Sequence, residues 1–547
     1  MPYRYSRKRI RDAARIARWQ GYDEAVFQRI GVPRQTLESL QAKFQGHFVV
    51  PGDPDYDKDR KLFNPVFDPR PLLIAYCAVE SDVALCLDMA RPNPAGPALN
   101  FAVRSGGHST AGYSGYCDNG LMIDVSGLDD VHVDRAAMTV TVGCGCTFAK
   151  LNSKLAADSL HVPGGECDDV CVGGYMQGGG YGFTSRSFGM NCDNVIALRV
   201  MLADGRIIEA SETTNYDLWW AMRGGTGGNF GVLLNVTYRL RSIGTVWGWS
   251  VTWPLESPRD RANASKGLLA LQYGYMRTTR TAEVNPQAMI CYQSDSNDPE
   301  GGDLRPWLIV RGMHLGSEES GRAALAPLLA TPGAQFQYGM YGAYVAINDA
   351  LLGYPQDIPP VPIKSRGMPN EGKAARYVAR DLAAEEWLAI LDYFVTTPSQ
   401  WSYMCLELYG AAINRYPVED SAFIHRDVAF SAFLDVFWYD DMPPGPVEDF
   451  LAGWCELMQL YWNGHIYQNY PSANVPDYRF NYWGPALFPL IKVKNKYDPG
   501  GLFTFPQQVS AYPDRAAADV ELPQRLARAL ATPISHAPAI GDARTVA

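Results

Sequence analysis

The segment Val162-Pro-Gly-Gly-Glu-Cys-Asp-Asp-Val-Cys-Val-Gly-Gly-Tyr-Met-Gln-Gly-Gly-Gly-Tyr-Gly182 has eight glycines among its twenty-one residues, and Cys167 lies between the first glycine pair and the next. Glycine lets the backbone approach a flat or anionic ligand closely and offers N–H donors without an obstructing side chain. A second such segment, Arg104-Ser-Gly-Gly-His-Ser-Thr-Ala-Gly112, lies about sixty residues upstream and centres on His108. Two glycine-rich loops, each presenting one nucleophilic side chain, predict two walls of a single cofactor site.

Length and composition indicate a large globular protein. The chain has 547 residues, of which 47% are hydrophobic and 19% charged, and a formal net charge of −10 that argues against nucleic acid as a partner. No apolar run reaches the roughly 18 to 20 residues that a membrane span requires, so no membrane span is expected. Eleven scattered cysteines, and a basic N-terminal segment without an apolar core after it, predict a cytoplasmic protein, with secretion left open. The oligomeric state stays open.

The first half of the chain predicts a mixture of short strands and short helices. Residues 1–45 place apolar residues such as Ala13 and Ile16 at helical spacing, and residues 46–242 alternate the two kinds of element. Within them, Asp204-Gly205 predicts the turn of a hairpin over 195–209. Further strands are expected at 71–78, 121–125, 138–142 and 231–240, and helices at 80–91, 148–157 and 217–223.

The second half predicts longer elements. Between 243 and 460 glycine becomes rarer, and we expect strands at 307–311, 403–409 and 428–438 and helices at 383–394 and 447–461. The proline-rich stretch 354–362 is expected to be a loop or a lid. Residues 461–511 again contain short motif-like segments. The Ala- and Pro-rich residues 512–547 predict a weakly ordered tail. The whole pattern predicts an α+β fold with more than one part.

Several common catalytic and binding motifs are missing from the sequence. There is no G-x-x-x-x-G-K-[ST] phosphate loop, no G-x-S-x-G elbow, and the run Gly178-Gly-Gly-Tyr-Gly182 fails the G-x-G-x-x-G spacing of a dinucleotide fold. Cys144, Cys146, Cys167 and Cys171 lack the paired spacing of a zinc site, so no metal is expected. A single loop histidine or a single cysteine is usually structural. A histidine and a cysteine that each lie within a glycine-rich loop instead favour a cofactor site.

The arrangement resembles the vanillyl-alcohol-oxidase-type FAD-linked oxidases, and specifically the berberine-bridge-enzyme-like branch that includes the oligosaccharide oxidases. The resemblance runs from about Phe48 to Gln508 and preserves the order of the motifs. These are Pro51-Gly-Asp with Tyr56, Arg60 and Asn64; Arg104-Ser-Gly-Gly-His108-Ser; Gly165-x-Cys167-x-x-Val170-x-Val-Gly-Gly174; Gly178-Gly-Gly-x-Gly182; Gly225-Thr-Gly-Gly-Asn-Phe-Gly-Val232; Tyr467-x-Asn-Tyr470; and Lys494-x-Lys-Tyr-Asp-Pro499 followed by Phe503.

The resemblance implies a two-part FAD-binding domain, 46–242 and 461–511, with an inserted α+β substrate domain over 243–460. It implies bicovalent FAD, with His108 bonded to the 8α carbon and Cys167 to C6 of the ring, and covalent substituents of this kind should favour hydride acceptance. Many relatives have Pro and Thr after the cysteine, where this chain has Asp168-Asp169. The implied cofactor contacts are Arg104, Ser105, Gly106, Gly107, Ser109, Gly112, Gly165, Val170, Gly173, Gly174, Gly179, Gly182, Gly231, Val232 and Asn469.

The resemblance also implies catalytic roles. Tyr470 corresponds to the base that removes a hydroxyl proton, and since an ordinary phenol has a pKa of about 10 it needs the help of a carboxylate, for which Glu407 is the candidate. Tyr467 is a second phenol or a flavin contact. Tyr403 would be a sugar-stacking platform on the same strand face as Glu407. Val170 resembles a gatekeeper for oxygen, which favours an oxidase over a dehydrogenase.

The expected reaction is oxidation of an alcohol group by hydride transfer to FAD, with O2 reduced to H2O2. The expected substrate is a small molecule, a mono- or oligosaccharide oxidised to a lactone at its anomeric hydroxyl. Two alternatives stay open at this point. One is an oxidase or dehydrogenase of a natural-product alcohol or amine, and the other is a non-catalytic protein that keeps the FAD fold for binding alone.

Overall fold

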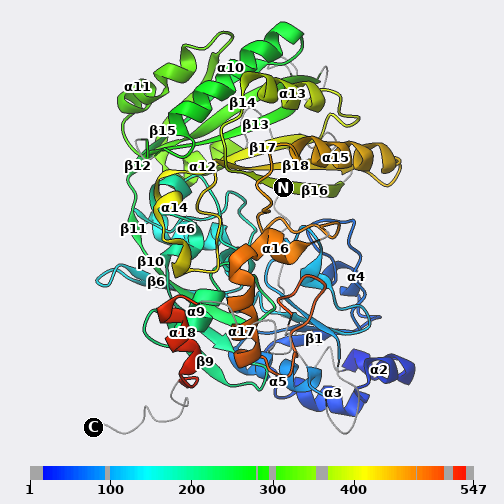
Figure 1. The fold of residues 1–547 in the computed structure, drawn as a ribbon. Coiled ribbons are helices and arrows are strands. Elements are labelled where there is room, and N and C mark those ends of the chain that lie inside the picture. Colours follow the sequence, from blue (N-terminus) through cyan, green and yellow to red (C-terminus); the bar gives the residue numbers. More distant parts are fainter. Residues whose placement is uncertain are drawn as a thin grey trace.

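The computed structural model describes residues 17–92, 99–278, 281–294, 304–352, 368–475, 477–510 and 522–536. Within these residues the strands form sheets of four, five and seven strands and one two-stranded pair. The seven-stranded sheet lies at the top of Figure 1, and the smaller sheets lie below it with the N-terminal helices and the C-terminal helices. The proline-rich stretch 354–362, and Ala13 and Ile16, lie outside the described residues.

The four-stranded sheet carries the first glycine-rich loop. Its order is β1-β2-β4-β3, with β2 and β3 both parallel to β4 and β1 antiparallel to β2. Parallel strands are usually covered on both faces of the sheet, so their sequences are continuously apolar. Leu121–Ile123 of β4 is such a run, and all three residues are buried. The strands are β1 (His47–Val49), β2 (Leu73–Tyr76), β3 (Phe101–Arg104) and β4 (Leu121–Asp124), and helices α4 (Tyr56–Asp59) and α5 (Glu80–Ala90) flank β2 in the chain.

The five-stranded sheet is antiparallel in the order β5-β6-β10-β8-β9. The predicted hairpin is confirmed, because β8 pairs with β9 and Gly205 adopts a φ of 85° that suits glycine in a tight turn. The strands are β5 (Val131–Asp134), β6 (Thr139–Gly143), β8 (Val195–Met201), β9 (Ile207–Ser211) and β10 (Val232–Arg239). The nearby helices are α6 (Phe148–Ala156), α7 (Val172–Gln177), α8 (Ser185–Phe188) and α9 (Tyr216–Ala221), and β7 (Leu160–His161) pairs with β11 (Arg241–Ser242).

The seven-stranded sheet is antiparallel in the order β15-β12-β14-β13-β17-β18-β16. Its strands are β12 (Thr245–Pro254), β13 (Val284–Ser294), β14 (Leu304–His314), β15 (Gln335–Ala343), β16 (Asn370–Val378), β17 (Tyr403–Leu408) and β18 (Phe430–Trp438). Helices α10 (Pro258–Tyr275), α11 (Glu318–Leu329), α13 (Ala384–Phe394) and α15 (Gly445–Met458) cover its outer face. Side chains of successive residues point to opposite faces, so every second residue of these strands faces the smaller sheets instead.

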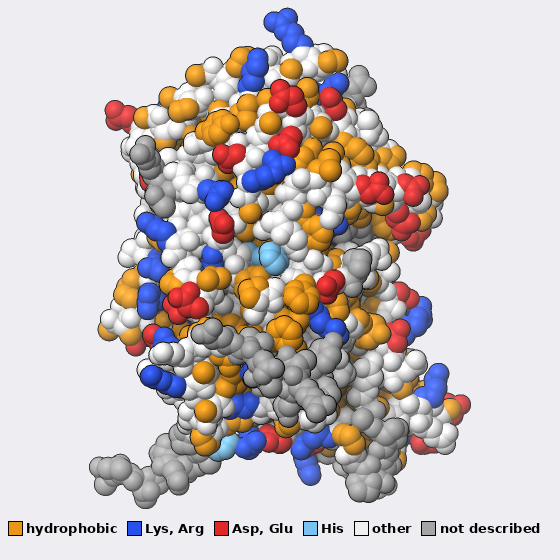
Figure 2. All heavy atoms as spheres, viewed as in Figure 1, with side chains coloured by type: hydrophobic (Ala, Val, Ile, Leu, Met, Phe, Trp, Pro, Cys, Tyr) orange, Lys and Arg blue, Asp and Glu red, His pale blue; other side chains and the backbone are white. Residues whose placement is uncertain are grey.

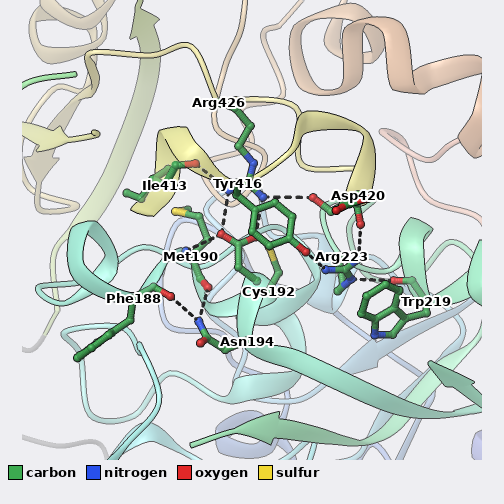
Figure 3. Close-up of polar contacts among 12 residues, drawn as sticks. Phe188, Met190, Cys192, Asn194, Trp219, Arg223, Ile413, Tyr416, Asp420 and Arg426 are labelled. Carbon is green, nitrogen blue, oxygen red and sulfur yellow. Dashed lines mark hydrogen bonds and ion pairs between the residues drawn. The ribbon is translucent and has the colours of Figure 1, made fainter. Parts of the chain in front are cut away.

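Buried charges join the two regions. Helix α14 (Ala411–Arg415) packs on α8, and the loop after it inserts Arg426, whose guanidinium donates to Asp193 at 2.6 and 2.8 Å. The side chains of this pair are only 5% and 3% exposed. Figure 3 shows Tyr416 beside Arg426 and Arg223, and its hydroxyl accepts from Arg223 at 2.7 Å. Because a buried charge is costly when its partner is lost, this joint fixes the seven-stranded sheet relative to β8.

The end of the chain returns to the smaller sheets. Lys494, in α17, is buried and donates to the carbonyl of Asn229, to Asp498 and to the carbonyl of Phe503 at 2.6–2.7 Å. The expected weakly ordered tail is wrong for residues 522–536, because the amphipathic helix α18 buries Leu526 and packs against α9 and α17. The helices of the two ends are α2 (Glu24–Ile30), α3 (Arg34–Gln41), α16 (Tyr478–Trp483), α17 (Leu487–Tyr497) and α18 (Gln524–Ala531), and α12 (Tyr344–Leu352) lies against β12.

Candidate active site

One large cavity lies between the inner face of the seven-stranded sheet and the glycine-rich loops. Its volume is about 1300 Å³. One wall comes from the loops around 105–110, 165–175, 226–233 and 503–507, and the opposite wall comes from β13, β16, β17 and β18. The loop around 467–471 lines it as well. Segments that are far apart in the sequence therefore meet around a single space.

Most of the predicted cofactor residues line this cavity. Those that do are Ser105, Gly106, Gly107, His108, Ser109, Gly165, Cys167, Val170, Gly173, Gly174, Gly231, Val232 and Asn469. Four predicted contacts lie outside the lining, each with another structural role. Arg104 forms a buried ion pair with Asp124 at 2.7 Å, whereas Gly112 packs on Phe67, Gly179 on Phe423 and Gly182 on the carbonyl of Gly164.

The glycine positions fit a ligand that approaches the backbone closely. A Cβ atom at Gly174 would meet no protein atom within 4 Å, so a side chain there would extend into the cavity. Gly228, with a φ of 75°, is nearly as open, because only the ring of Phe505 lies within 4 Å. Aromatic side chains line the same region: Phe101, Tyr113, Tyr482, Phe503 and Phe505. Glycine backbone that is open to the cavity, beside flat apolar surfaces, suits a ligand with both a phosphate linker and planar rings, as FAD has.

Two contacts hold the imidazole of His108, one on a face of the ring and one at its edge. Its imidazole stacks on Phe63 with 4.6 Å between the ring centroids and an interplanar angle of 30°. Its Nε2 lies 3.6 Å from Oδ1 of Asp169, which belongs to the other glycine-rich loop. Burial raises the pKa of Asp169, but His108 and a backbone hydrogen bond lower it, and the net pKa is below the usual range. The two loops thus meet through an imidazole–carboxylate pair.

Cys167 presents its thiol to the cavity. Although the side chain is accessible, the surrounding walls shield it from bulk solvent, and this burial, with the carboxylates of Glu166 and Asp169, raises the pKa of the Cys167 thiol to about 12. Glu166 ties the loop to the sheet, because Gln287 donates to its Oε1 at 2.8 Å and Arg311 lies 3.6 Å from its Oε2.

Tyr470 and Glu407 form a hydrogen bond across the cavity wall. The Tyr470 hydroxyl donates to Glu407 Oε1 at 2.6 Å, although the two residues are 63 positions apart. Burial raises the pKa of Glu407 to about 8, against the opposing effects of this hydrogen bond and the Lys373 ammonium. Its Oε2 has no hydrogen-bond partner among the described residues. A carboxyl group that titrates near neutral pH beside a phenol can receive a proton that the phenol passes on.

Tyr467 occupies a different position from Tyr470. Its hydroxyl oxygen accepts hydrogen bonds from the Gly180 N–H at 2.7 Å and from Asn469 Nδ2 at 3.0 Å. The rings of Tyr467 and Tyr470 are nearly perpendicular, with 4.9 Å between their centroids. Tyr403 lines the cavity from the same face of β17 as Glu407, as its spacing predicts, and its ring stacks with Phe437.

The sequence did not indicate a charged cluster on β16 and β18. Lys373 Nζ lies 2.7 Å from Asp435 and 3.8 Å from Glu371, and 4.6 Å from the ring centroid of Tyr470. All three charged side chains line the cavity and are at most 10% exposed. Burial and Asp435 raise the pKa of Glu371 to about 7. No motif marks these positions, since alternating charges on a strand usually indicate a solvated face.

In the described part of the chain, no group of three or more His, Cys, Asp or Glu side chains is arranged to hold a metal ion. None of the described helices has both the length and the apolar character needed to cross a membrane. On the face shown in Figure 2, Lys and Arg side chains lie interspersed with Asp and Glu side chains, separated by hydrophobic and uncharged polar surface.

Comparison with known proteins agrees with this geometry. A family profile described as "FAD binding domain" matches residues 71–211, and one described as "Berberine and berberine like" matches residues 466–510. The chain is 29% identical over 471 residues to the uncharacterised FAD-linked oxidoreductase YvdP of Bacillus subtilis, covering 85% of this chain and 98% of that protein. It is 27% identical over 515 residues to a carbohydrate oxidase of Microdochium nivale, covering 87% and 95%.

A solved structure shares the fold along nearly its whole length. BBE-like 1 of Physcomitrella patens matches with a TM-score of 0.75 and 25% identity, covering 87% of this chain and 100% of that one. The two profile matches lie on either side of the seven-stranded sheet in the sequence, so the FAD-binding fold is built from two separate pieces with an α+β region between them. The chain is an FAD-linked oxidoreductase whose profile matches, relatives and fold are similar to those of berberine-bridge-enzyme-like proteins.

Proposed function

We propose that the protein is an oxidase that carries FAD bonded to His108 and Cys167 and oxidises the anomeric hydroxyl of a mono- or oligosaccharide to a lactone. The observation that carries the proposal is the 2.6 Å hydrogen bond from Tyr470 to Glu407, made on the cavity wall opposite the glycine-rich loops. When bound, FAD supplies a hydride acceptor and a route for two electrons to O2, giving H2O2. The residues of the chain supply the binding, the orientation and the proton transfer.

Proton removal in this proposal is shared by two side chains. Burial and the neighbouring Glu407 carboxylate raise the pKa of Tyr470 well above its usual range, so Tyr470 acts as a base only if it gives up its own proton as it receives one. Glu407 Oε1 already accepts the hydrogen bond from the Tyr470 hydroxyl, so it is placed to receive that proton. A pKa of about 8 suits this task near neutral pH, since the carboxylate is available and its protonated form is not strongly disfavoured.

The cavity chemistry supports a neutral polyhydroxylated substrate. The rings of Tyr403, Phe433 and Phe437 line it beside carboxylates that accept hydrogen bonds from hydroxyl groups. Asp435 Oδ1 is buried and has no hydrogen-bond partner among the described residues, so it is free to accept one from a substrate. The similarity to a carbohydrate oxidase supports the same substrate class.

The test begins with the cofactor. The purified protein should be yellow, and a tryptic digest should yield one flavin-bearing mass that joins the peptides of His108 and Cys167. Each single change, His108→Ala or Cys167→Ala, should leave one bond, and only the double variant should release free FAD on acid precipitation. A colourless protein without flavin would refute the proposal and favour a non-catalytic role.

Substrate and base are tested by turnover. A panel of aldoses and oligosaccharides should produce H2O2, and aromatic or allylic alcohols should not; the reverse result would favour natural-product chemistry. Tyr470→Phe should slow flavin reduction by the best sugar about 100-fold or more while leaving the flavin attached. Unchanged reduction in this variant would remove Tyr470 from the mechanism.

A further inference from the structure

The loop after Cys167 brings a carboxylate to the other proposed attachment residue. Asp169 Oδ1 lies 3.6 Å from Nε2 of His108, although the two side chains belong to different glycine-rich loops. Phe63 covers one face of the same imidazole, with 4.6 Å between the ring centroids. The imidazole ring is therefore fixed with one nitrogen toward Asp169.

We propose that Asp169 promotes the bonding of FAD to His108, by keeping the imidazole proton on Nε2 and by accepting that proton as the bond forms at Nδ1. This inference rests on the proposed His108 linkage and adds the group that makes it form. A neutral imidazole carries one N–H and one free lone pair, and a carboxylate beside one nitrogen places the proton there. The lone pair is then on Nδ1, where a nucleophile is needed.

The overall reaction balances with O2 as the oxidant. The bond that forms joins Nδ1 of His108 to the 8α carbon of FAD, and the bonds that break are the Nε2–H of the imidazole and one C–H of the 8α methyl group. The C–H carbon loses two electrons, which pass through the ring to O2. The two protons, one from Nε2 by way of Asp169 and one from the methyl group, complete H2O2.

The surroundings of Asp169 suit a proton acceptor. Its side chain is 37% exposed, so a proton received from His108 can pass on to solvent. Burial raises the pKa of Asp169, but His108 and a backbone hydrogen bond bring the net pKa below its usual range, which keeps Asp169 a carboxylate at neutral pH. Asp168 differs, because burial and the nearby carboxylates of Asp349 and Asp169 raise its pKa. Asp168 is thus a matched control with the same charge and nearly the same position.

The competing explanation is that Asp169 only holds the two loops together. In that case its loss would weaken FAD binding or the stability of the protein, and attachment would slow only in proportion to binding. In our proposal the attachment rate falls although FAD still occupies its site. The two explanations therefore differ in whether binding and attachment change together.

The experiment measures attachment directly in a Cys167→Ala background, where His108 makes the only bond. Full-length apoprotein from riboflavin-auxotrophic cells is mixed with saturating FAD in air, quenched with acid at intervals, and assayed by in-gel flavin fluorescence and intact mass. Asp169→Asn should attach FAD about 100-fold more slowly than the parent, the low end of what a general base contributes. Asp168→Asn should attach it at the parent rate, and both variants should bind FAD and unfold thermally like the parent.

Two additional variants separate chemistry from folding. Asp169→Ala should be partly rescued by formate, which replaces the missing carboxylate, and Asp169→Glu should attach FAD faster than Asp169→Asn. Attachment by Asp169→Asn at or above the parent rate would overturn the inference and leave the His108 linkage standing. An unlinked parent would overturn the linkage itself and the inference with it. If Asp169→Asn binds no FAD, a Glu variant that binds FAD without attaching it would also refute the role.

Discussion

Glu407→Gln is the most informative single change, because it removes one ionisable oxygen from the Tyr470 hydrogen bond while keeping the size of the side chain and an acceptor atom. The structure gives the Glu407 carboxyl a pKa of about 8, raised from 4.5 mainly by burial. At pH 7 only about one-tenth of the protein would then hold Glu407 ionised. In the proposed mechanism the ionised form accepts the proton from Tyr470, so flavin reduction should rise about tenfold between pH 7 and its plateau above pH 8.

The variant should lose both the rate and its pH dependence. Removing a general base typically lowers a rate by about 10²- to 10⁴-fold, so we expect Glu407→Gln to be about 1000-fold slower on the plateau. The assay is anaerobic stopped-flow reduction of the flavin by the best sugar of the panel, measured from pH 6 to 10. Asp349→Asn, which removes another carboxylate that lines the cavity, should keep the wild-type profile. A Gln variant with the wild-type inflection near pH 8 would refute the reasoning.

Stability provides an independent check that needs no substrate. A carboxyl group whose pKa is raised in the folded protein binds its proton more tightly there than in the unfolded chain, so stability falls as the pH rises from 4.5 towards 8. At about 1.4 kcal/mol per pKa unit, the penalty reaches up to about 5 kcal/mol above pH 8. Glu407→Gln should therefore match wild type in urea unfolding near pH 4.5 and exceed it above pH 8. Equal stability at both pH values would show that Glu407 is not held in its protonated form by burial.

Three further results are expected. Lys373→Met should move the inflection of the reduction rate to higher pH, because the Lys373 ammonium lowers the pKa of Glu407. Lys373→Arg keeps the positive charge and should leave the inflection in place. An unchanged pH profile in the Lys373→Met variant would contradict the argument. Arg426→Met should lower the free energy of unfolding by about 3–5 kcal/mol by stranding the buried Asp193 carboxylate, and a loss below about 1 kcal/mol would mean that water solvates the site. Gly174→Leu should reduce FAD loading in flavin-limited expression without lowering the thermal stability of the apoprotein, since its Cβ would meet no protein atom within 4 Å; full loading would exclude this wall from the cofactor site.

The fold was largely predictable where local patterns are strong. Asp204-Gly205 marked the hairpin because a tight turn needs such residues, and the alternating segment 138–142 became β6. The tail was mispredicted for a physical reason. Its alanines and prolines suggest weak order, but the apolar stripe that includes Leu526 forms a helix by packing against α9 and α17, which local composition does not reveal.

The site was predictable only where a motif marked it. The loops around His108 and Cys167 are visible in sequence because glycine is demanded by a close approach of backbone to ligand. Arg104 belongs to the same motif, yet it lies outside the cavity lining and forms a buried ion pair with Asp124, a partner 20 residues away that the motif does not indicate. Lys373 had no signal at all, because a strand pattern gives the residues that share a face but not whether a cavity lies against that face.

The assembly of the site from three distant segments has a consequence for how the enzyme can change. The proposed attachment residues lie on the first piece of the FAD-binding fold, the proposed base Tyr470 lies on the C-terminal return, and its partner Glu407 lies on the inserted sheet. In the proposed mechanism, the Tyr470–Glu407 contact must keep its geometry for proton transfer. The other cavity-facing positions of β16 and β18 sit on a rigid, antiparallel framework whose outer face is already buried by α15. Glu371, Lys373 and Asp435 line the cavity at these positions, and substrate fit can change there only if the charges change together. Losing Lys373 alone would strand the buried Asp435 carboxylate and raise the pKa of Glu407.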